Sequence, residues 1–158
     1  MKALLRTERS IPLLVVRLTA GVVMLPHGLQ KTLGLFGGPG FSGTMKFFTE
    51  TVGVPWILAL LAILAESLGA LGLIFGAFAR VAALAIGSVM VVAVLKGGHL
   101  EQGFFMNWLG TQKGEGYEYH LLVMGLCLAV LIGGAGSFSY DRRVSSRLPA
   151  FPPLHAGM

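Results

Sequence analysis

Residues 52–79, VGVPWILALLAILAESLGALGLIFGAFA, form the stretch that decides the fold of this 158-residue chain. The run is longer than the roughly 20 apolar residues that a helix needs to cross a bilayer. Its one charged residue is Glu66, whose neighbours on both sides are aliphatic, aromatic or small. A carboxyl group near the centre of a bilayer costs at least ~2.5 kcal/mol. We therefore expect Glu66 to have a charged partner, a bound proton or a function.

The composition of the whole chain is that of a membrane protein. Hydrophobic residues make up 54% and charged residues 12%, and the mean hydropathy is +0.77, well outside the range of ordinary soluble domains. The net charge of +5 does not indicate nucleic-acid binding, because the basic residues lie at the ends of the apolar stretches, where they can meet lipid headgroups. The one cysteine, Cys127, excludes an internal disulfide and a CxxC redox pair.

Four apolar stretches predict four membrane-spanning helices, at residues 11–33, 55–77, 80–96 and 119–136. We therefore predict an all-α fold, an integral membrane four-helix bundle. Glycines on the expected spans, such as Gly69, Gly87 and Gly125, would let the helices approach closely. Residues 34–53 and 97–118 are expected to be connecting loops on the same side of the membrane.

The distribution of positive charge predicts the orientation of the spans. Seven basic residues flank one side: Lys2, Arg6, Arg9, Arg80, Arg142, Arg143 and Arg147. Four flank the other: Lys31, Lys46, Lys96 and Lys113. By the positive-inside rule the richer side is cytoplasmic, and an even number of spans puts both termini there. The chain then divides into a cytoplasmic N-terminal segment (1–10), a transmembrane domain (11–141) and a cytoplasmic C-terminal tail (142–158).

Polar side chains of the first span are expected to meet Glu66. Arg17, His27 and Lys31 project within a wedge of about 80° on an ideal helix. At about 1.5 Å per residue from the span ends, the depth of Glu66 in the membrane differs by about 7–8 Å from that of Arg17 and from that of His27. Pro26 removes an intrahelical hydrogen bond beside His27. We therefore expect Arg17, His27 and Glu66 to form one enclosed cluster.

Two further histidines, His99 and His120, are expected near the outer ends of the third and fourth spans, at about the depth of His27. A zinc or copper site made by these three histidines is an alternative, but nothing in their spacing demands it, so we assign no metal site. His155, in a proline-rich tail, is interpreted as inert.

Each polar residue of the expected cluster also has a purely structural interpretation. Arg17 can extend to the headgroups. Glu66 can form a buried ion pair with Arg17, or stay protonated and bond to a carbonyl group. Lys31 can be an anchor at the membrane surface. These interpretations stay open beside the functional one.

Short motifs occur in a distinctive order along the chain. They are Arg17, Gly21, His27-Gly28-x-x-Lys31, Glu66, Gly76 with Arg80, and Gly134-Ala135-Gly136-Ser137-Phe138-Ser139-Tyr140-Asp141. In this order and spacing they resemble the DoxX family of small four-span membrane proteins. The family's last motif usually reads Gly-Pro-Gly, and Ala135 departs from it. The resemblance implies a multi-pass protein of the bacterial-type cytoplasmic (inner) membrane, with some relatives associated with quinone-linked sulfur oxidation and others with oxidative-stress complexes.

The leading functional hypothesis is a redox-associated subunit that binds a quinone or another small lipophilic ligand in a polar pocket within the bundle. The expected catalytic residues are Glu66 and His27, which would exchange protons with the quinone oxygens, and the expected ligand-binding residues are Arg17, Lys31, His99 and His120. The sequence carries no haem-attachment, iron–sulfur or flavin motif, so no covalently bound cofactor is expected.

The alternative is a non-catalytic accessory or assembly subunit of a larger membrane complex, whose polar cluster fixes the register of the helices. Expected partners are the lipid bilayer and either another membrane or redox protein or a second copy of the chain. A transporter would have to oligomerise, because the chain is short and has no convincing internal repeat. Whether the chain is an enzyme, as a quinone-linked oxidoreductase subunit, stays open at this point.

Overall fold

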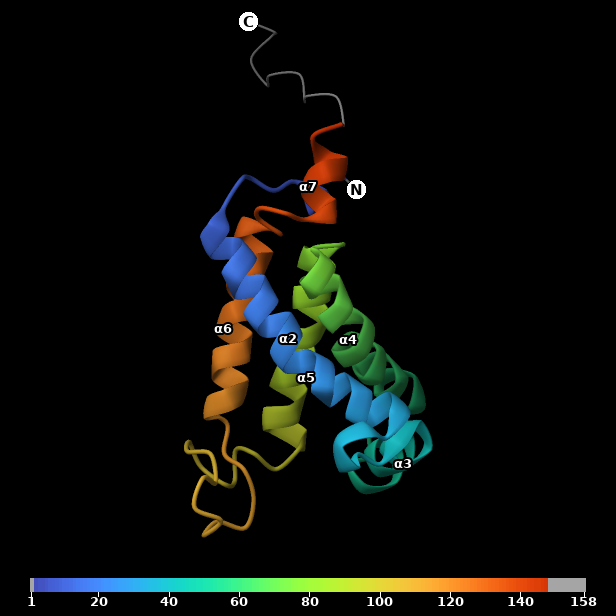
Figure 1. Ribbon diagram of the computed structural model, residues 1–158. Coiled ribbons are helices and arrows are strands. Elements are labelled where there is room, and N and C mark those ends of the chain that lie inside the picture. The colour runs from blue at the N-terminus through green and yellow to red at the C-terminus, as the bar shows by residue number, and fades with distance from the viewer. Residues whose placement is uncertain (1, 148–158) are drawn as a thin grey trace, which may run out of the picture.

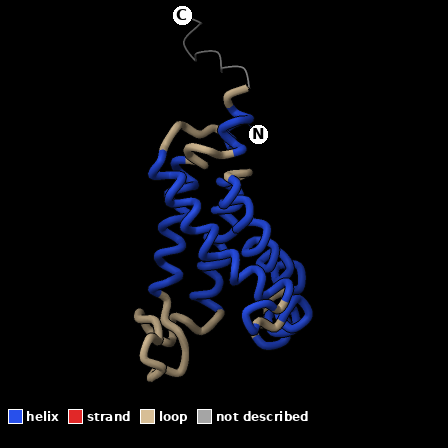
Figure 2. Tube along the Cα trace, viewed as in Figure 1, coloured by secondary structure: helices blue, strands red, loops and turns tan. Residues whose placement is uncertain are grey.

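The computed structural model describes residues 2–147, so the rest of the expected C-terminal tail, with His155, lies outside the described residues. The helices in chain order are α1 (Lys2–Leu5), α2 (Ile11–Leu33), η1 (Leu35–Gly37), α3 (Gly40–Lys46), η2 (Phe47–Thr51), α4 (Trp56–Phe75), α5 (Ala79–Lys96), α6 (Glu118–Gly133) and α7 (Tyr140–Ser145). Figure 2 shows helices and loops, and no strand, over the described part of the chain. The predicted all-α fold is confirmed.

Four of these helices, α2, α4, α5 and α6, pack together as the bundle (Figure 1). Of these, α2, α4 and α5 are long and apolar enough to cross a membrane. At 16 residues, α6 is a shorter apolar helix, about 24 Å long at 1.5 Å per residue, and it packs along α5. The bundle therefore has the predicted membrane-spanning architecture, with one short member.

Local sequence signals account for the ends of the helices. The Ser10 side chain caps α2 by accepting a hydrogen bond from the Leu13 N–H at 3.3 Å. At the other end of α2, Gly34 takes a left-handed conformation with φ of 72°, which a residue without a Cβ adopts without strain. The helix continues through Pro26. Gly76 ends α4 in the same way as Gly34, with φ of 63°.

The segment after α2 was expected to be a loop, and that expectation is wrong. Residues 34–53 contain the helical elements η1, α3 and η2. Thr44 and Met45 of α3 are buried, and Met45 packs with Ala59 and Ile63 of α4. The physical reason is that the first half of α4 is apolar and extends past the end of α2. Its buried face therefore packs against α3 instead of α2.

The two ends of the bundle differ in what they carry (Figure 1). We call the end with α1 and α7 the terminal end, and the end with α3 and residues 97–117 the loop end. Residues 34–53 and 97–117 lie at the same end, as expected from the sequence. The buried face of α4 carries, from the loop end to the terminal end, Ala59, Ile63, Glu66, Ala70 and Leu73. Glu66 thus separates two clusters of buried apolar side chains.

Candidate functional site

The centre of the candidate site is an ion pair between Lys31 of α2 and Glu66 of α4. The Glu66 residue is 3% exposed, and the Lys31 side chain is 22% exposed. Glu66 lies about 15 Å from the first residue of α4, at 1.5 Å per residue, in the middle of that helix. The lysine therefore compensates a carboxylate that would otherwise be costly at this depth.

A close crossing of α2 and α4 brings this pair together. A Cβ atom placed on Gly28 would lie 2.6 Å from the Glu66 carbonyl oxygen and 2.6 Å from the Ser67 Cα. One on Gly21 would lie 2.9 Å from the Ala70 carbonyl oxygen. Only glycine allows this approach, because a side chain would force the two backbones apart. Lys31, one turn after Gly28, then reaches Glu66.

His27 lies one turn before Lys31 on α2 and is partly exposed. The charges of Lys31 and Glu66 both act on it. Its ring packs on Tyr119 of α6, with ring centroids 5.6 Å apart. The Tyr119 hydroxyl donates to the Met24 sulfur at 3.3 Å. Three helices, α2, α4 and α6, therefore contribute to one polar cluster, which we call the Glu66 cluster: Met24, His27, Lys31, Glu66 and Tyr119.

The other two expected histidines continue this cluster towards the loop end. Tyr119 packs on His120, with centroids 5.5 Å apart, and His120 packs on His99 at 4.1 Å. His120 is 7% exposed, and within residues 2–147 its Nδ1 is buried without a hydrogen-bond partner. The His99 Nδ1–H donates to the Glu115 carbonyl oxygen at 2.8 Å. The rings form a continuous row from His99 to His27.

The predicted contact between Arg17 and Glu66 is not made. Arg17 is 1% exposed, and its guanidinium hydrogen-bonds to the carbonyl oxygens of Leu73 and Ile74 at the end of α4, at 2.7 and 2.5 Å. These carbonyls are about 11 Å along α4 from Glu66, at 1.5 Å per residue. The prediction counted depth as though the first two spans were level, but α4 extends past α2 at the loop end. Lys31 takes the place expected for Arg17.

Arg17 instead joins three parts of the chain at the terminal end. Besides the α4 carbonyls, it donates to the carbonyl oxygens of Ala135 at 2.8 Å, Ser137 at 3.2 Å and Phe138 at 2.8 Å. The carbonyls at a helix end lack partners within the helix, and Arg17 supplies donors to those of α4. We call this arrangement the Arg17 clamp.

Asp141, the first acidic residue of α7, completes the same region. Its carboxylate accepts hydrogen bonds from the Phe78 N–H at 2.7 Å and the Ala79 N–H at 2.8 Å, and so caps the start of α5. The Asp141 N–H donates to the Gly76 carbonyl oxygen at 2.9 Å. Burial raises the pKa of the Asp141 carboxyl, and the two N–H donors and the charges of Arg17 and Arg80 oppose this shift.

Two members of the Glu66 cluster, Met24 and Tyr119, were missed by sequence reasoning. Tyr119 was only a span boundary there, although a tyrosine beside a histidine at the start of an apolar helix is a signal that could have been used. Gly28, which lies outside the cluster, was part of a motif, but its role in the crossing was not foreseen. No group of three or more metal-binding side chains is present among residues 2–147.

The DoxX family model matches residues 12–99, which is more than half of the chain. The chain belongs to the DoxX family. The matched region includes α2 to α5 and with them His27, Lys31 and Glu66. The chain is similar to Inner membrane protein YqjF of Escherichia coli (strain K12), with 28% identity over 139 residues, 87% of this chain and 95% of that protein. No solved structure matches the chain.

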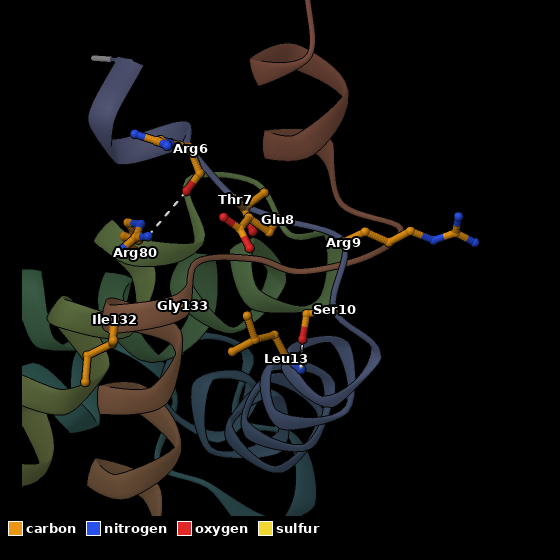
Figure 3. A pocket seen from close by; sticks show the side chains of 9 residues that line it. All are labelled: Arg6, Thr7, Glu8, Arg9, Ser10, Leu13, Arg80, Ile132 and Gly133. Atoms are coloured by element: carbon orange, nitrogen blue, oxygen red, sulfur yellow. Dashed lines mark hydrogen bonds between the residues drawn. The ribbon is translucent and has the colours of Figure 1, made fainter. Parts of the chain in front are cut away.

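As a DoxX-family member with three long apolar helices, the protein is an integral membrane protein. The family match covers most of the Glu66 cluster. Met24, His27, Lys31 and Glu66 lie within residues 12–99, whereas Tyr119 and its neighbour His120 lie outside. The cavity drawn in Figure 3 lies elsewhere, at the terminal end, and none of the cluster residues lines it.

Proposed function

We propose that this DoxX-family protein binds a quinone, or another small lipophilic ligand with a polar head, at the Glu66 cluster and acts as a redox-associated membrane subunit. The observation that carries the proposal is the Lys31–Glu66 ion pair beside His27, buried between two apolar clusters of the bundle. Ionisable groups inside a membrane bundle are costly and more often mark a site than a packing solution.

The residues present fit a quinone head. Lys31 and His27 are partly exposed donors at the edge of the cluster, Tyr119 offers a ring face, and the buried Nδ1 of His120 has no partner in the described chain. A bound quinone would supply reversible electron and proton uptake. Lys31 would hold the more negative oxygen of the head, and His27 would donate or accept a proton at the other side.

Glu66 acts in this proposal as the group that orients Lys31 and exchanges a proton with His27. His120 and His99 extend the site towards water at the loop end, where protons can enter. Arg17 was expected among the ligand-binding residues, but all its hydrogen bonds go to backbone carbonyls at the terminal end, so we leave it out. Electrons would come from a partner protein or a small reductant.

A binding titration tests the proposal. Purified protein in mild detergent is titrated with a short-chain ubiquinone analogue, and affinity is compared for wild type, Glu66→Gln, Lys31→Gln and His27→Asn. We expect each substitution to weaken binding by at least about tenfold, because Lys31→Gln and His27→Asn each remove a group that bonds to the head, and Glu66→Gln removes the carboxylate that orients Lys31. A titration of Glu66→Gln that matches wild type would rule out this function.

The chain offers a matched control for that experiment. Lys46 and Glu50 are a second lysine–glutamate pair near the loop end, 4.0 Å apart, with side chains 73% and 66% exposed. Lys46→Gln and Glu50→Gln remove the same charges outside the Glu66 cluster. Both variants should bind the analogue as wild type does, which separates a site effect from a change in net charge.

The second candidate function is a non-catalytic accessory or assembly subunit. The same ion pair favours it in one respect, because Lys31 and Glu66 connect α2 to α4 and so fix their register. Affinity purification from native membranes distinguishes the two functions. A stoichiometric partner protein that is retained with normal complex activity after His27→Asn supports the accessory role and contradicts ligand chemistry at His27.

A location in the inner membrane is also part of the proposal. The Escherichia coli relative is, by its name, an inner membrane protein. In this chain, Arg6, Arg9 and Arg80 lie around one pocket (Figure 3), and α7, which carries Arg142 and Arg143, lies at the terminal end (Figure 1). The positive-inside rule therefore favours a cytoplasmic terminal end.

A further inference from the structure

A pocket at the terminal end is independent of the Glu66 cluster. It has a volume of about 510 Å³, and the residues that line it include Arg6, Glu8, Arg9, Leu13, Arg80 and Ile132 (Figure 3). These residues come from the segment between α1 and α2, from the first turn of α2, from the start of α5 and from the end of α6. The pocket therefore lies where three bundle helices begin or end.

Charges of both signs line this pocket without pairing. Arg6, Arg80 and Glu8 all contribute to its wall, yet none of them forms an ion pair anywhere in residues 2–147. Opposite charges that share a pocket but stay more than 4 Å apart leave room for a group between them. Such a group would carry a negative charge for the arginines and a positive charge for the glutamate.

Arg80 is held in place by the backbone. Its guanidinium donates to the Leu131 carbonyl oxygen and, at 3.3 Å, to the Arg6 carbonyl oxygen. The latter bond is the dashed line at Arg80 in Figure 3. Its Nε is buried and has no hydrogen-bond partner in the described chain. A guanidinium that the backbone holds in place, and that forms no ion pair within 4 Å in the described part of the chain, is suited to a phosphate oxygen.

The position of the pocket points to a lipid. Helix ends of a membrane bundle lie at the level of the headgroups. The wall also includes Leu13 and Ile132, and Ile132 is 73% exposed on the outside of α6. An apolar surface therefore leads from the pocket onto the face of the bundle that meets acyl chains. A soluble ligand would make no use of this surface.

We propose that this pocket binds the headgroup of a phospholipid that carries both a phosphate and a primary ammonium group, a phosphoethanolamine lipid. Arg6 and Arg80 bind the phosphate, and Glu8 accepts hydrogen bonds from the ammonium. The glycerol and acyl chains pass over Leu13 and Ile132. Arg9 takes no part, because its side chain extends away from the pocket in Figure 3.

The test is lipid retention measured by native mass spectrometry on the delipidated full-length protein. The protein is mixed with equal amounts of phosphatidylethanolamine, phosphatidylglycerol and phosphatidylcholine. We expect phosphatidylethanolamine to be retained severalfold more than the other two, because phosphatidylglycerol lacks the ammonium and choline lacks N–H donors. Glu8→Gln should abolish the preference over phosphatidylglycerol, and Arg6→Gln should weaken retention of both lipids.

Arg143→Gln is the matched control, since it removes the same charge at an exposed position of α7 that does not line the pocket. It should retain lipids as wild type does. An equal loss for Arg143→Gln and Arg6→Gln would show general attraction to charge and overturn the site. An unchanged preference in Glu8→Gln would overturn the ammonium contact, and full displacement of lipid by free phosphoethanolamine would overturn the assignment to a lipid.

Discussion

Glu66 and Lys31 are the residues on which the candidate site depends most. A charged side chain that is 3% exposed is accommodated at low cost only if its partner stays in place. Lys31 is also the more accessible of the two, with 22% of its side chain exposed. The pair thus joins a fully enclosed charge to one that a ligand can reach.

Removing one member of this pair should destabilise the bundle. Glu66→Gln or Lys31→Gln leaves a charge without its partner, and we expect each to lower the free energy of unfolding by about 3 kcal/mol. Replacing both residues by apolar ones, Lys31→Met with Glu66→Leu, should recover most of that loss. Reversible unfolding in mixed micelles measures the four proteins. A double variant as unstable as the sum of the single variants would contradict the pairing.

At the scale of residues, the sequence predicted the burial of Glu66 and its proximity to His27 but named the wrong cation. Aliphatic neighbours over three turns on both sides make burial of Glu66 unavoidable in a helix that spans a membrane. The partner depends on how far α4 is shifted along α2. The glycines at positions 21 and 28 report that shift only once the residues that they face on α4 are known.

The crossing of α2 and α4 is the element-scale feature that creates the site. Gly28 lies against the backbone of Glu66 and Ser67, with no space for a methyl group. Gly125 of α6, which the sequence also suggested as a contact glycine, has no neighbouring atom within 4 Å of a built Cβ. The two glycines therefore provide an internal comparison.

Gly28→Ala should separate α2 from α4 and weaken the Lys31–Glu66 contact. Overpacking of this kind costs about 1–3 kcal/mol, and quinone affinity should fall with it. Gly125→Ala should leave the stability unchanged or slightly higher, because alanine is the better helix former. Unfolding free energies of both variants check this expectation. Equal effects at the two positions would show that the crossing is not tight.

The Arg17 clamp is the second element-scale feature, and its geometry requires a guanidinium. A lysine has three donors on one nitrogen and cannot span carbonyls from α4 and from residues 135–138. Arg17→Lys should therefore leave buried carbonyls unpaired, at roughly 1–3 kcal/mol for each such group. Arg143→Lys, at an exposed position of α7, is the control. A stability of Arg17→Lys within error of the control would contradict the clamp.

At the scale of elements, the apolar runs predicted the spans. They did not predict the helical segment that packs on the first half of α4. The predicted first span and α2 have the same ends, residues 11 and 33, because a cap at Ser10 and a glycine at position 34 mark them. The frequent glycine and proline of residues 34–53 predict a loop. Tertiary packing of Met45 on α4 outweighed that local composition.

The whole molecule places both described ends of the chain at one end of the bundle (Figure 1). We expect that end to face the cytoplasm. Thr111 lies in the exposed stretch of residues 97–117, and Ser146 lies just after α7. Each is replaced by cysteine in its own variant, and the native Cys127 is buried. In intact cells, a membrane-impermeant maleimide should label Thr111→Cys and spare Ser146→Cys until the cells are opened. The reverse pattern would contradict the orientation.

The Arg17 clamp has a mechanical consequence for the bundle. Five hydrogen bonds tie α2, α4 and the segment before α7 at one end, whereas towards the loop end α2 meets α6 through the Tyr119–Met24 hydrogen bond and the packing of the His27 and Tyr119 rings. Separating α2 from α6 should therefore break fewer hydrogen bonds towards the loop end than at Arg17. The loop end is also where the row of rings leads from His99 to His27.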